Sequence, residues 1–257
     1  MIEVKSRFHI QRLFCDFSKD LHLTDIIKPV YLSGIVDDSN DVSIPFFYKV
    51  ERGYTAVTDL KNSLGAIFSG MKSNVRNEIR RAEREGIKCE YGYWYDEFIP
   101  YYNDFCKGRG LDDSITKERL VRYKETLISR AVFNGNILAM HATVIDRGES
   151  LAMLLFSCSD RFSKDADLQR IGWANRYLHY KDFEYLQLQG IKTYDWAGVA
   201  LSPSNPQHTI GQFKLSFGGK LTRTLVLTTP LFNYFYKAKH LLSRGLELRN
   251  NKPSTFV

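Results

Sequence analysis

Cysteine is scarce in this chain, and long apolar runs are missing. The 257 residues include four cysteines, at positions 15, 89, 106 and 158, with no Cys-x-x-Cys pair among them. That spacing predicts free thiols in a reducing compartment and no metal site. No stretch approaches the ~20 apolar residues of a membrane-spanning helix, and the N-terminus lacks the apolar core of a signal peptide. The sequence therefore predicts a cytoplasmic protein, with contact at the inner face of a membrane left open.

Acidic residues are fewer than basic ones. The chain has 36 Lys and Arg against 29 Asp and Glu, a net charge of +7. This excess favours anionic partners such as phosphates, nucleic acid or an acidic membrane surface, although ordinary solubility explains it equally well. Hydrophobic residues make up 44% of the chain, with 17 Phe and 15 Tyr. Such a composition excludes disorder except at the ends and supports one large domain or two small ones packed closely.

Strand and helix patterns alternate along the chain. A polar turn is expected at residues 37–41, and Asn134-Gly135 is a hairpin signal between two apolar strands. The strand after it extends the pair to a three-stranded meander. We predict strands at 44–50, 54–60, 87–93, 128–133, 137–145, 151–157, 192–196 and 221–228, and helices at 69–86, 94–107, 116–127, within 165–190 and at 231–249. This order indicates an α+β (mixed α/β) fold.

Three segments have residues suited to chemistry at a single cleft. In Gln169–Ala174, a glycine near a helix start would let backbone N–H groups and the helix dipole hold a diphosphate. In Phe213–Gly219, aromatic rings flank Lys214, whose ammonium could stabilise an oxyanion. In Tyr194–Val199, Asp195 ends a strand and could orient an amine or take its proton. Each segment also has a plain structural interpretation, as a helix start, a strand-to-turn segment and a capped turn.

Three weaker candidates remain open. His141 lies in a strand and is either a base or a hydrogen-bonded core histidine. Cys158 follows an apolar strand and is better explained as a buried thiol than as a nucleophile. Basic residues recur every four positions along the predicted helix 69–86, so they form either a solvated face or an anion-binding stripe: Lys72, Arg76, Arg80 and Arg84.

The order of these segments resembles the FemAB transferases. The run RNEIRRAEREGIKCE resembles that family's Arg-rich helix leading into a glycine and a strand. The runs GWANRYLHYKDFEYLQLQGIKTYDWAGV and GQFKLSFGGKL resemble its C-terminal signature, and the likeness covers residues 54–228. The segment from Gln169 also fits the (Gln/Arg)-x-x-Gly-x-(Gly/Ala) pattern of acetyltransferases that bind coenzyme A.

The resemblance implies a fold and a domain division. We expect a GNAT-like acyl-CoA N-acyltransferase fold, with a central, mostly antiparallel sheet flanked by helices. Residues 1–90 would form a reduced N-terminal GNAT-like unit that includes the basic helix 69–86. Residues 91–230 would form the acyltransferase core, and 231–257 a basic C-terminal helix and tail.

The resemblance also implies an activity and its residues. It implies transfer of an acyl group from a coenzyme A thioester to a primary amine of a cell-envelope precursor, an amino sugar or peptide that is nucleotide- or lipid-linked. Lys214 and Asp195 would be catalytic. The donor would be bound by Gln169, Arg170, Gly172, Trp173, Ala174 and Asn175, and the acceptor by Arg76, Arg80, Phe213, Tyr194 and His141.

Two other functions remain open. The first keeps the fold and replaces the donor with aminoacyl-tRNA, which a basic surface also suits. No long heptad hairpin like the arm of the tRNA-using FemAB members is present, which disfavours this alternative. The second is a non-catalytic adaptor that contacts a membrane through residues 231–252, where aromatic and basic side chains alternate.

Overall fold

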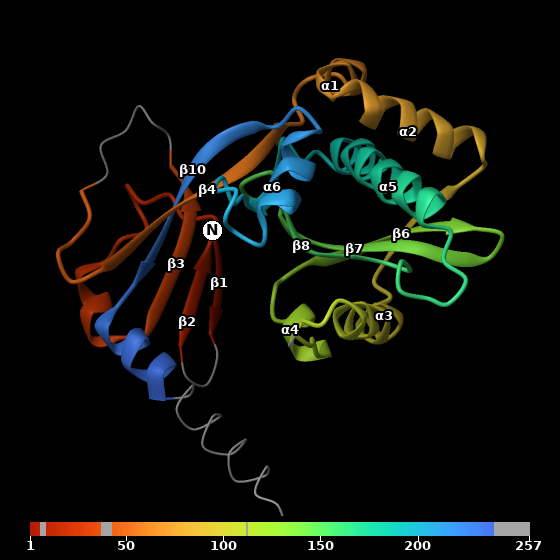
Figure 1. Ribbon diagram of the computed structural model, residues 1–257. Coiled ribbons are helices and arrows are strands. Elements are labelled where there is room, and N and C mark those ends of the chain that lie inside the picture. Colours follow the sequence, from red (N-terminus) through yellow and green to blue (C-terminus); the bar gives the residue numbers. More distant parts are fainter. Residues whose placement is uncertain (6–8, 37–42, 112, 239–257) are drawn as a thin grey trace, which may run out of the picture. The chain divides into compact units, whose positions relative to one another are not determined.

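The chain forms two compact units. The computed structural model describes residues 1–5, 9–36, 43–111 and 113–238, and Figure 1 gives the labels used below. Unit 1 comprises Met1–Gly53 and Arg223–Val257, and unit 2 comprises Tyr54–Thr222. The chain passes between the units within β4 (Lys49–Asp59) and β10 (Lys220–Thr228). The division thus falls earlier than the predicted boundary at residue 90, because the segment after β4 packs into the core of unit 2.

Unit 1 is built on four strands. β2 (Ile10–Leu13) lies between β1 (Ile2–Lys5), to which it is antiparallel, and β3 (Val30–Ile35), to which it is parallel. β10 pairs antiparallel with the other edge of β3. The 3-10 helix η1 (Leu23–Ile27) contributes the fully buried Asp25.

Asp25 is neutralised inside unit 1 by a buried ion pair. The Arg12 guanidinium donates to the Asp25 carboxylate at 2.6 Å, and the Tyr48 hydroxyl donates to it at 2.9 Å. Burial of a carboxylate is tolerated only with such partners. The network therefore fixes η1 to β2.

Unit 2 contains a six-stranded sheet. The order is β4-β9-β8-β7-β6-β5, and every pair is antiparallel except β8 and β9, which are parallel. The strands beyond β4 are β5 (Lys88–Gly92), β6 (Thr126–Phe133), β7 (Asn136–Asp146), β8 (Leu151–Ser159) and β9 (Thr193–Gly198). The meander β6-β7-β8 is confirmed, and Asn134 and Gly135 have φ of 50° and 80° as its first turn requires.

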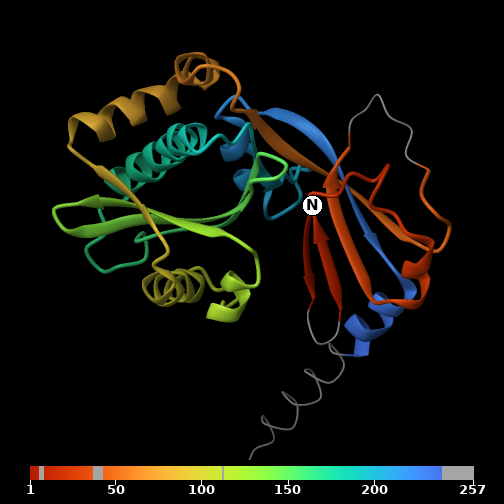
Figure 2. The ribbon, with the colours of Figure 1, turned by 180° about the vertical axis from the view of Figure 1, so that it is seen from behind.

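Helices cover both faces of this sheet, as Figures 1 and 2 show. Alternate residues of each strand face opposite sides, so two cores form. α1 (Leu64–Gly70), α2 (Ser73–Arg84) and α5 (Leu168–Leu188) bury one face around Ala139 and Trp196. α3 (Tyr95–Gly108) and α4 (Lys117–Val121) bury the other around Met140 and Phe156. α6 (His208–Leu215) follows β9.

Three predicted elements differ from the structure. Residues 44–48 form a turn in which the Tyr48 N–H donates to the Pro45 carbonyl, so the strand predicted at 44–50 is wrong up to residue 48. The helix predicted at 69–86 divides at Met71, which turns inward and is 2% exposed. The helix predicted at 116–127 ends at Val121, because Thr126 donates its hydroxyl hydrogen to Leu120 and joins β6.

The C-terminal tail is described only in part. Residues 230–238 are helical, as predicted, and Phe232 packs edge-on against His9. The polar turn predicted at 37–41 and the tail from residue 239 lie outside the described residues. Among the described residues, no helix is both long enough and apolar enough to cross a bilayer.

Candidate active site

The sheet of unit 2 opens between its two parallel strands. β8 and β9 pair over only three positions, ending at Met153 and Asp195. β8 continues to Ser159 against β7, so in the described structure residues 154–159 have no strand on their β9 side. A cavity of about 410 Å³ occupies this opening, within the size range of small-ligand sites. It is lined by residues 154–159, the end of β9, and parts of α3, α5 and α6.

One face of α5 forms a wall of the cavity. Its lining residues are Gly172, Asn175, Arg176 and His179, with Ile171 beside them. These positions follow the i, i+3, i+4, i+7 spacing that places side chains on one face of a helix. Gly172 leaves room here, since a Cβ added to it would meet only Arg176, at 3.6 Å.

Lys214 also lines the cavity, from the last turn of α6. Its ammonium donates to the carbonyl oxygens of Ala197 and Gly198, at 3.0 and 2.9 Å. An ammonium has three hydrogens, so one remains for a ligand. Burial lowers the pKa of Lys214 to about 8, against the opposing effect of the Asp195 charge. The group is therefore mostly cationic at neutral pH, but held with little water around it.

Asp195 shapes the strand end that Lys214 contacts. Its carboxylate accepts a short hydrogen bond from the Thr55 hydroxyl and one of 2.8 Å from the Ala197 N–H. Ala197 has φ 55°, a left-handed conformation that is costly for a residue other than glycine. Burial raises the pKa of Asp195, while Thr55, Ala197 and Lys214 oppose that shift. The side chain does not line the cavity, so its observed task is to hold the turned backbone.

The charged groups that line the cavity are all basic. Its charged residues in the described structure are Arg109, Arg161, Arg176 and Lys214, with no carboxylate among them. Arg176 is paired with Glu78 at 3.0 Å, whereas the side chains of Arg109 and Arg161 have no partner among the described residues. An opening with several cations and no anion attracts a negatively charged ligand.

Close packing brings the two free arginines to the same cavity. Phe162 follows Arg161 and lies 5.6 Å from Phe105 between ring centroids. A Cβ at Gly108 would meet Phe162 atoms at 2.7 Å, so only glycine allows this approach. The contact fixes the loop after β8 against the end of α3, where Arg109 is the C-cap residue.

The N-terminus of α5 differs from the sequence prediction. α5 begins at Leu168, four residues before Gly172, so the Gly172–Ala174 amides lie within the helix and are used by its i→i−4 bonds. Asp167 caps the helix: its side chain accepts from the Arg170 N–H at 3.0 Å, and its carbonyl accepts from the Ile171 N–H at 2.9 Å. A carboxylate thus already occupies the position proposed for a diphosphate.

The other predicted donor-binding residues point away from the cavity. Arg170 pairs with Asp167 at 2.9 Å and stacks on Phe133. Trp173 packs under Arg81 of α2, and Ala174 is fully buried in the core. Gln169 is exposed and does not line the cavity, so Gly172 and Asn175 are the members of the predicted set that do.

The predicted acceptor-binding residues are also divided. Phe213 lines the cavity with Lys214. Tyr194 is fully buried and packs edge-on against Trp196 at 5.3 Å. Arg76 donates to the carbonyls of Ser69 and Met71, and so closes the end of α1.

Arg80 is the second predicted acceptor-binding residue on α2. It stacks over Phe68 at 5.1 Å and, like Arg76, does not line the cavity. Two residues of the basic stripe on α2, Arg76 and Arg80, are therefore engaged in local contacts.

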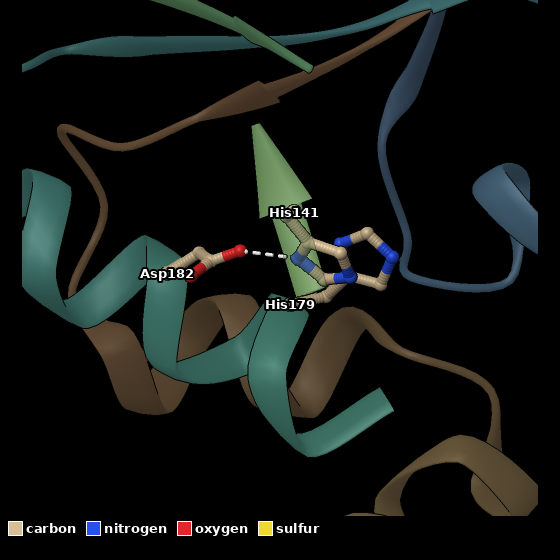
Figure 3. A group of neighbouring side chains, drawn as sticks. All are labelled: His141, His179 and Asp182. Carbon is tan, nitrogen blue, oxygen red and sulfur yellow. Dashed lines mark hydrogen bonds and ion pairs between the residues drawn. The ribbon is translucent and has the colours of Figure 1, made fainter. Parts of the chain in front are cut away.

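A buried polar chain runs behind the α5 wall (Figure 3). His141 of β7 joins two side chains of α5: its Nδ1 lies 2.7 Å from Asp182 Oδ2, and its Nε2 lies 3.0 Å from Asn175 Oδ1. The His179 ring stacks on His141 with 3.9 Å between centroids, and its Nδ1 is buried without a partner. Burial lowers the pKa of His179 well below its usual range, and the charges of His141, Lys214 and Arg176 act in the same direction. His179 is therefore a neutral imidazole in the cavity wall.

These side chains suit a hydrogen-bond network better than a metal. The candidate ligand atoms of His141, His179 and Asp182 lie within 4.8 Å of one another. Zinc–nitrogen bonds of about 2.0–2.1 Å require all ligands to converge on one point. Here the imidazoles stack face to face, and His141 and Asp182 are bonded to each other.

The four cysteines are free, and one lines the cavity. Cys158 is 2% exposed, and burial raises the pKa of its thiol well above the usual value. A protonated thiol is a poor nucleophile at neutral pH. Cys158 therefore contributes apolar wall, as the sequence favoured.

Sequence reasoning missed Arg109, Arg161, Arg176 and His179. The α5 pair had a detectable signal, because Gly172, Asn175, Arg176 and His179 share one helix face in the printed sequence. This signal was missed because Gln169–Ala174 was interpreted as a linear glycine motif and not as part of a helix face. Arg109 and Arg161 had no such signal, since their proximity depends on the Gly108–Phe162 contact.

Comparison with known proteins finds solved structures with a similar fold. No family model matches the chain, and no curated protein matches its sequence. Among solved structures, FemX is similar with a TM-score of 0.64 and 11% identity, over 87% of this chain and 82% of FemX. L-PGS from Bacillus licheniformis gives 0.56 and 15%, over 89% and 80%. The C-terminal domain of a protein described as a lysylphosphatidylglycerol synthetase from Agrobacterium fabrum gives 0.52 and 13%, over 78% and 67%.

The chain has the FemAB-like form of the GNAT fold. The expected fold class is therefore confirmed: a mixed sheet flanked by helices. At these identities the likeness concerns the fold, and the reaction of this chain has to be argued from its own cavity.

Proposed function

We propose that the FemAB-like cavity between β8 and β9 transfers an acyl group from an activated, phosphate-bearing donor to a primary amine. The observation that supports this most is Lys214, a half-buried cation with one free hydrogen in the wall of a cavity that has no carboxylate in its described lining. Acyl transfer develops negative charge on the carbonyl oxygen. A fixed cation in a water-poor site stabilises that charge strongly.

The proposed step is direct attack without a covalent enzyme intermediate. The amine nitrogen donates its lone pair to the acyl carbon, and the carbonyl π pair moves to oxygen, beside Lys214. Collapse of that oxyanion breaks the bond to the carrier, whose sulfur or oxygen leaves with the electron pair. The nitrogen loses one proton. The leaving group takes up that proton. His179 remains a neutral imidazole in the wall, because its lowered pKa makes it a weak base.

Asp195 has a positioning task in this proposal. Through the Ala197 N–H it holds the left-handed turn whose carbonyls bind Lys214. This replaces the role of amine base that the sequence suggested for it, since a group outside the cavity lining does not reach the reacting nitrogen.

An acyl thioester of coenzyme A is the first donor we propose. The free edge of β8 offers main-chain groups to an extended arm, and Arg109 and Arg161 offer charge to its phosphates. The helix-start amides contribute less than expected, because Asp167 occupies them.

Aminoacyl-tRNA is the second donor, and the Asp167 cap favours it. A site that binds phosphate through arginine side chains rather than through a diphosphate loop also suits the phosphodiesters of an RNA 3′ end. We propose an amino sugar or amino acid of a nucleotide- or lipid-linked envelope precursor as acceptor. Residues 231–252 would contact the membrane where the acceptor is lipid-linked.

The test uses labelled donors and a matched pair of variants. Radiolabelled acetyl-CoA and alanyl-tRNA are each incubated with the full chain, using a UDP-linked amino sugar and a lysine-containing UDP-muramoyl pentapeptide as acceptors. We expect Lys214→Ala to slow transfer at least ~10-fold, whereas Lys220→Ala, at an exposed position of β10, keeps the wild-type rate. Equal rates in both variants would remove Lys214 from the reaction, and no transfer from either donor would reject the proposed function.

A further inference from the structure

Asn175 is the one amide side chain that lines the cavity, among the described residues, and it is held from behind. It lies on α5, and its Oδ1 lies 3.0 Å from His141 Nε2. His141 is fully buried in β7 and lies 2.7 Å from Asp182 Oδ2, two turns further along α5. A buried histidine therefore holds an amide that borders the cavity, and Figure 3 shows how Asp182 in turn contacts that histidine.

Donor and acceptor accounting decides which way this amide faces. The structure places the Asn175 oxygen toward His141 Nε2, and an amide oxygen only accepts, so Nε2 is the donor in this contact. The Asn175 nitrogen then has no partner among the described residues, and its two hydrogens are available to the cavity.

The network is not arranged for stability alone. Asp182 Oδ1 and His179 Nδ1 are buried without hydrogen-bond partners among the described residues, and an unpaired buried polar atom destabilises the fold. An apolar pair at positions 141 and 182 would remove the unpaired carboxylate atom. The His141–Asp182 pair lies behind the cavity wall, and His141 contacts the Asn175 amide that lines the cavity. This placement suits the pair to positioning that amide.

We propose that Asn175 donates a hydrogen bond to the same acyl carbonyl oxygen as Lys214, and that His141 and Asp182 are positioning residues that keep its nitrogen toward the cavity. This rests on the proposed acyl transfer and adds a second donor to its oxyanion site. Loss of one such donor slows acyl-transfer enzymes about 10²–10³-fold, mostly through kcat.

The kinetic test pairs a truncation with a substitution of equal size. Asn175→Ala removes the donor, and Asp182→Asn replaces the carboxylate that contacts the His141 ring. We expect kcat to fall about 100-fold in the first and about 10-fold in the second, with KM for the donor nearly unchanged. Glu184→Gln is the matched control, because it makes the same acid-to-amide change on the same helix in a surface pair with Lys181.

A second measurement reads the positioning without substrate. In the full chain labelled with 15N-histidine, the Nε2 of His141 should carry the hydrogen that it donates to Asn175, and Asp182→Asn should weaken that hydrogen bond. A His141 Nε2 without a hydrogen in the wild type would overturn this inference by itself. So would a wild-type kcat in Asn175→Ala while Lys214→Ala is slow, an outcome that leaves the acyl transfer intact. Absence of transfer by the wild type would overturn both.

Discussion

Lys214 is cationic where the surroundings disfavour charge. Its ammonium is held by two carbonyls in a buried wall, and burial lowers its pKa to about 8 from the usual 10.5. The unfolded chain therefore binds a proton at this lysine more tightly than the folded chain does. Between these two pKa values the unfolded state has more protons bound, so folding stability contributed by Lys214 rises with pH.

The first prediction concerns this linkage. The free energy of unfolding of the wild type should rise relative to that of Lys214→Met as pH increases from 7 to 10, by up to about 3 kcal/mol for a shift from 10.5 to about 8. Denaturant unfolding at several pH values measures it. The pair of wild type and Lys220→Met, at an exposed lysine, should show no such change. A difference between wild type and Lys214→Met that stays flat with pH would mean that Lys214 is not desolvated.

At the scale of elements, α6 shows what sequence patterns could and could not predict. The meander, its Asn-Gly turn, α5 and β9 followed from periodicity and turn residues, and the structure confirms them. The segment from Phe213 to Gly219 instead suggested a strand-to-turn region, and it is the end of a helix followed by a turn. Helix formation there depends on contacts with distant segments, such as the Ser216 carbonyl accepting from the Lys72 N–H at 2.9 Å.

The candidate site was predictable to a similar degree. Lys214, Phe213, Gly172 and Asn175 could be named from motifs, and the structure places all four around one cavity. Arg109 and Arg161 could not, because residues 52 positions apart meet only through tertiary packing. Asp167 is a residue type that commonly caps helices, so its role at the start of α5 could be seen in the sequence. The glycine motif suggested a later helix start.

The turn after α6 makes a prediction about packing. Gly218 has φ 78°, and a Cβ there would meet the Gly70 carbonyl oxygen at 2.4 Å. Gly218→Ala should therefore lower the free energy of unfolding by about 2 kcal/mol or more, from backbone strain and the clash together. Thermal or urea denaturation measures it.

The same substitution elsewhere serves as the control. Gly65 lies in α1 with nothing within 4 Å of an added Cβ, so Gly65→Ala should be neutral or stabilising by up to about 1 kcal/mol. Equal effects of the two substitutions would show that the α6 turn is not packed against the end of α1 as described.

At the scale of the whole molecule, charge and fold point to the same kind of partner. The chain has a net charge of +7, and the cavity of unit 2 is lined by cations with no carboxylate among its described residues. The fold is shared with FemX and L-PGS at 11% and 15% identity, so it supports the architecture and not a substrate. The account therefore depends on one cavity, which has to admit the activated acyl group for any of the proposed chemistry to occur.

Gly172 offers the most direct measurement of that requirement. A Cβ at Gly172 would meet only Arg176, at 3.6 Å, and leucine is a good helix former, so Gly172→Leu should fold at least as stably as the wild type while its side chain enters the cavity. Single-turnover acyl transfer by Gly172→Leu, with a melting temperature measured on the same sample, is the decisive experiment. The account predicts an unchanged or higher melting temperature and transfer reduced at least ~100-fold, the order of loss that follows a misplaced substrate. Transfer at the wild-type rate by this folded variant would contradict it.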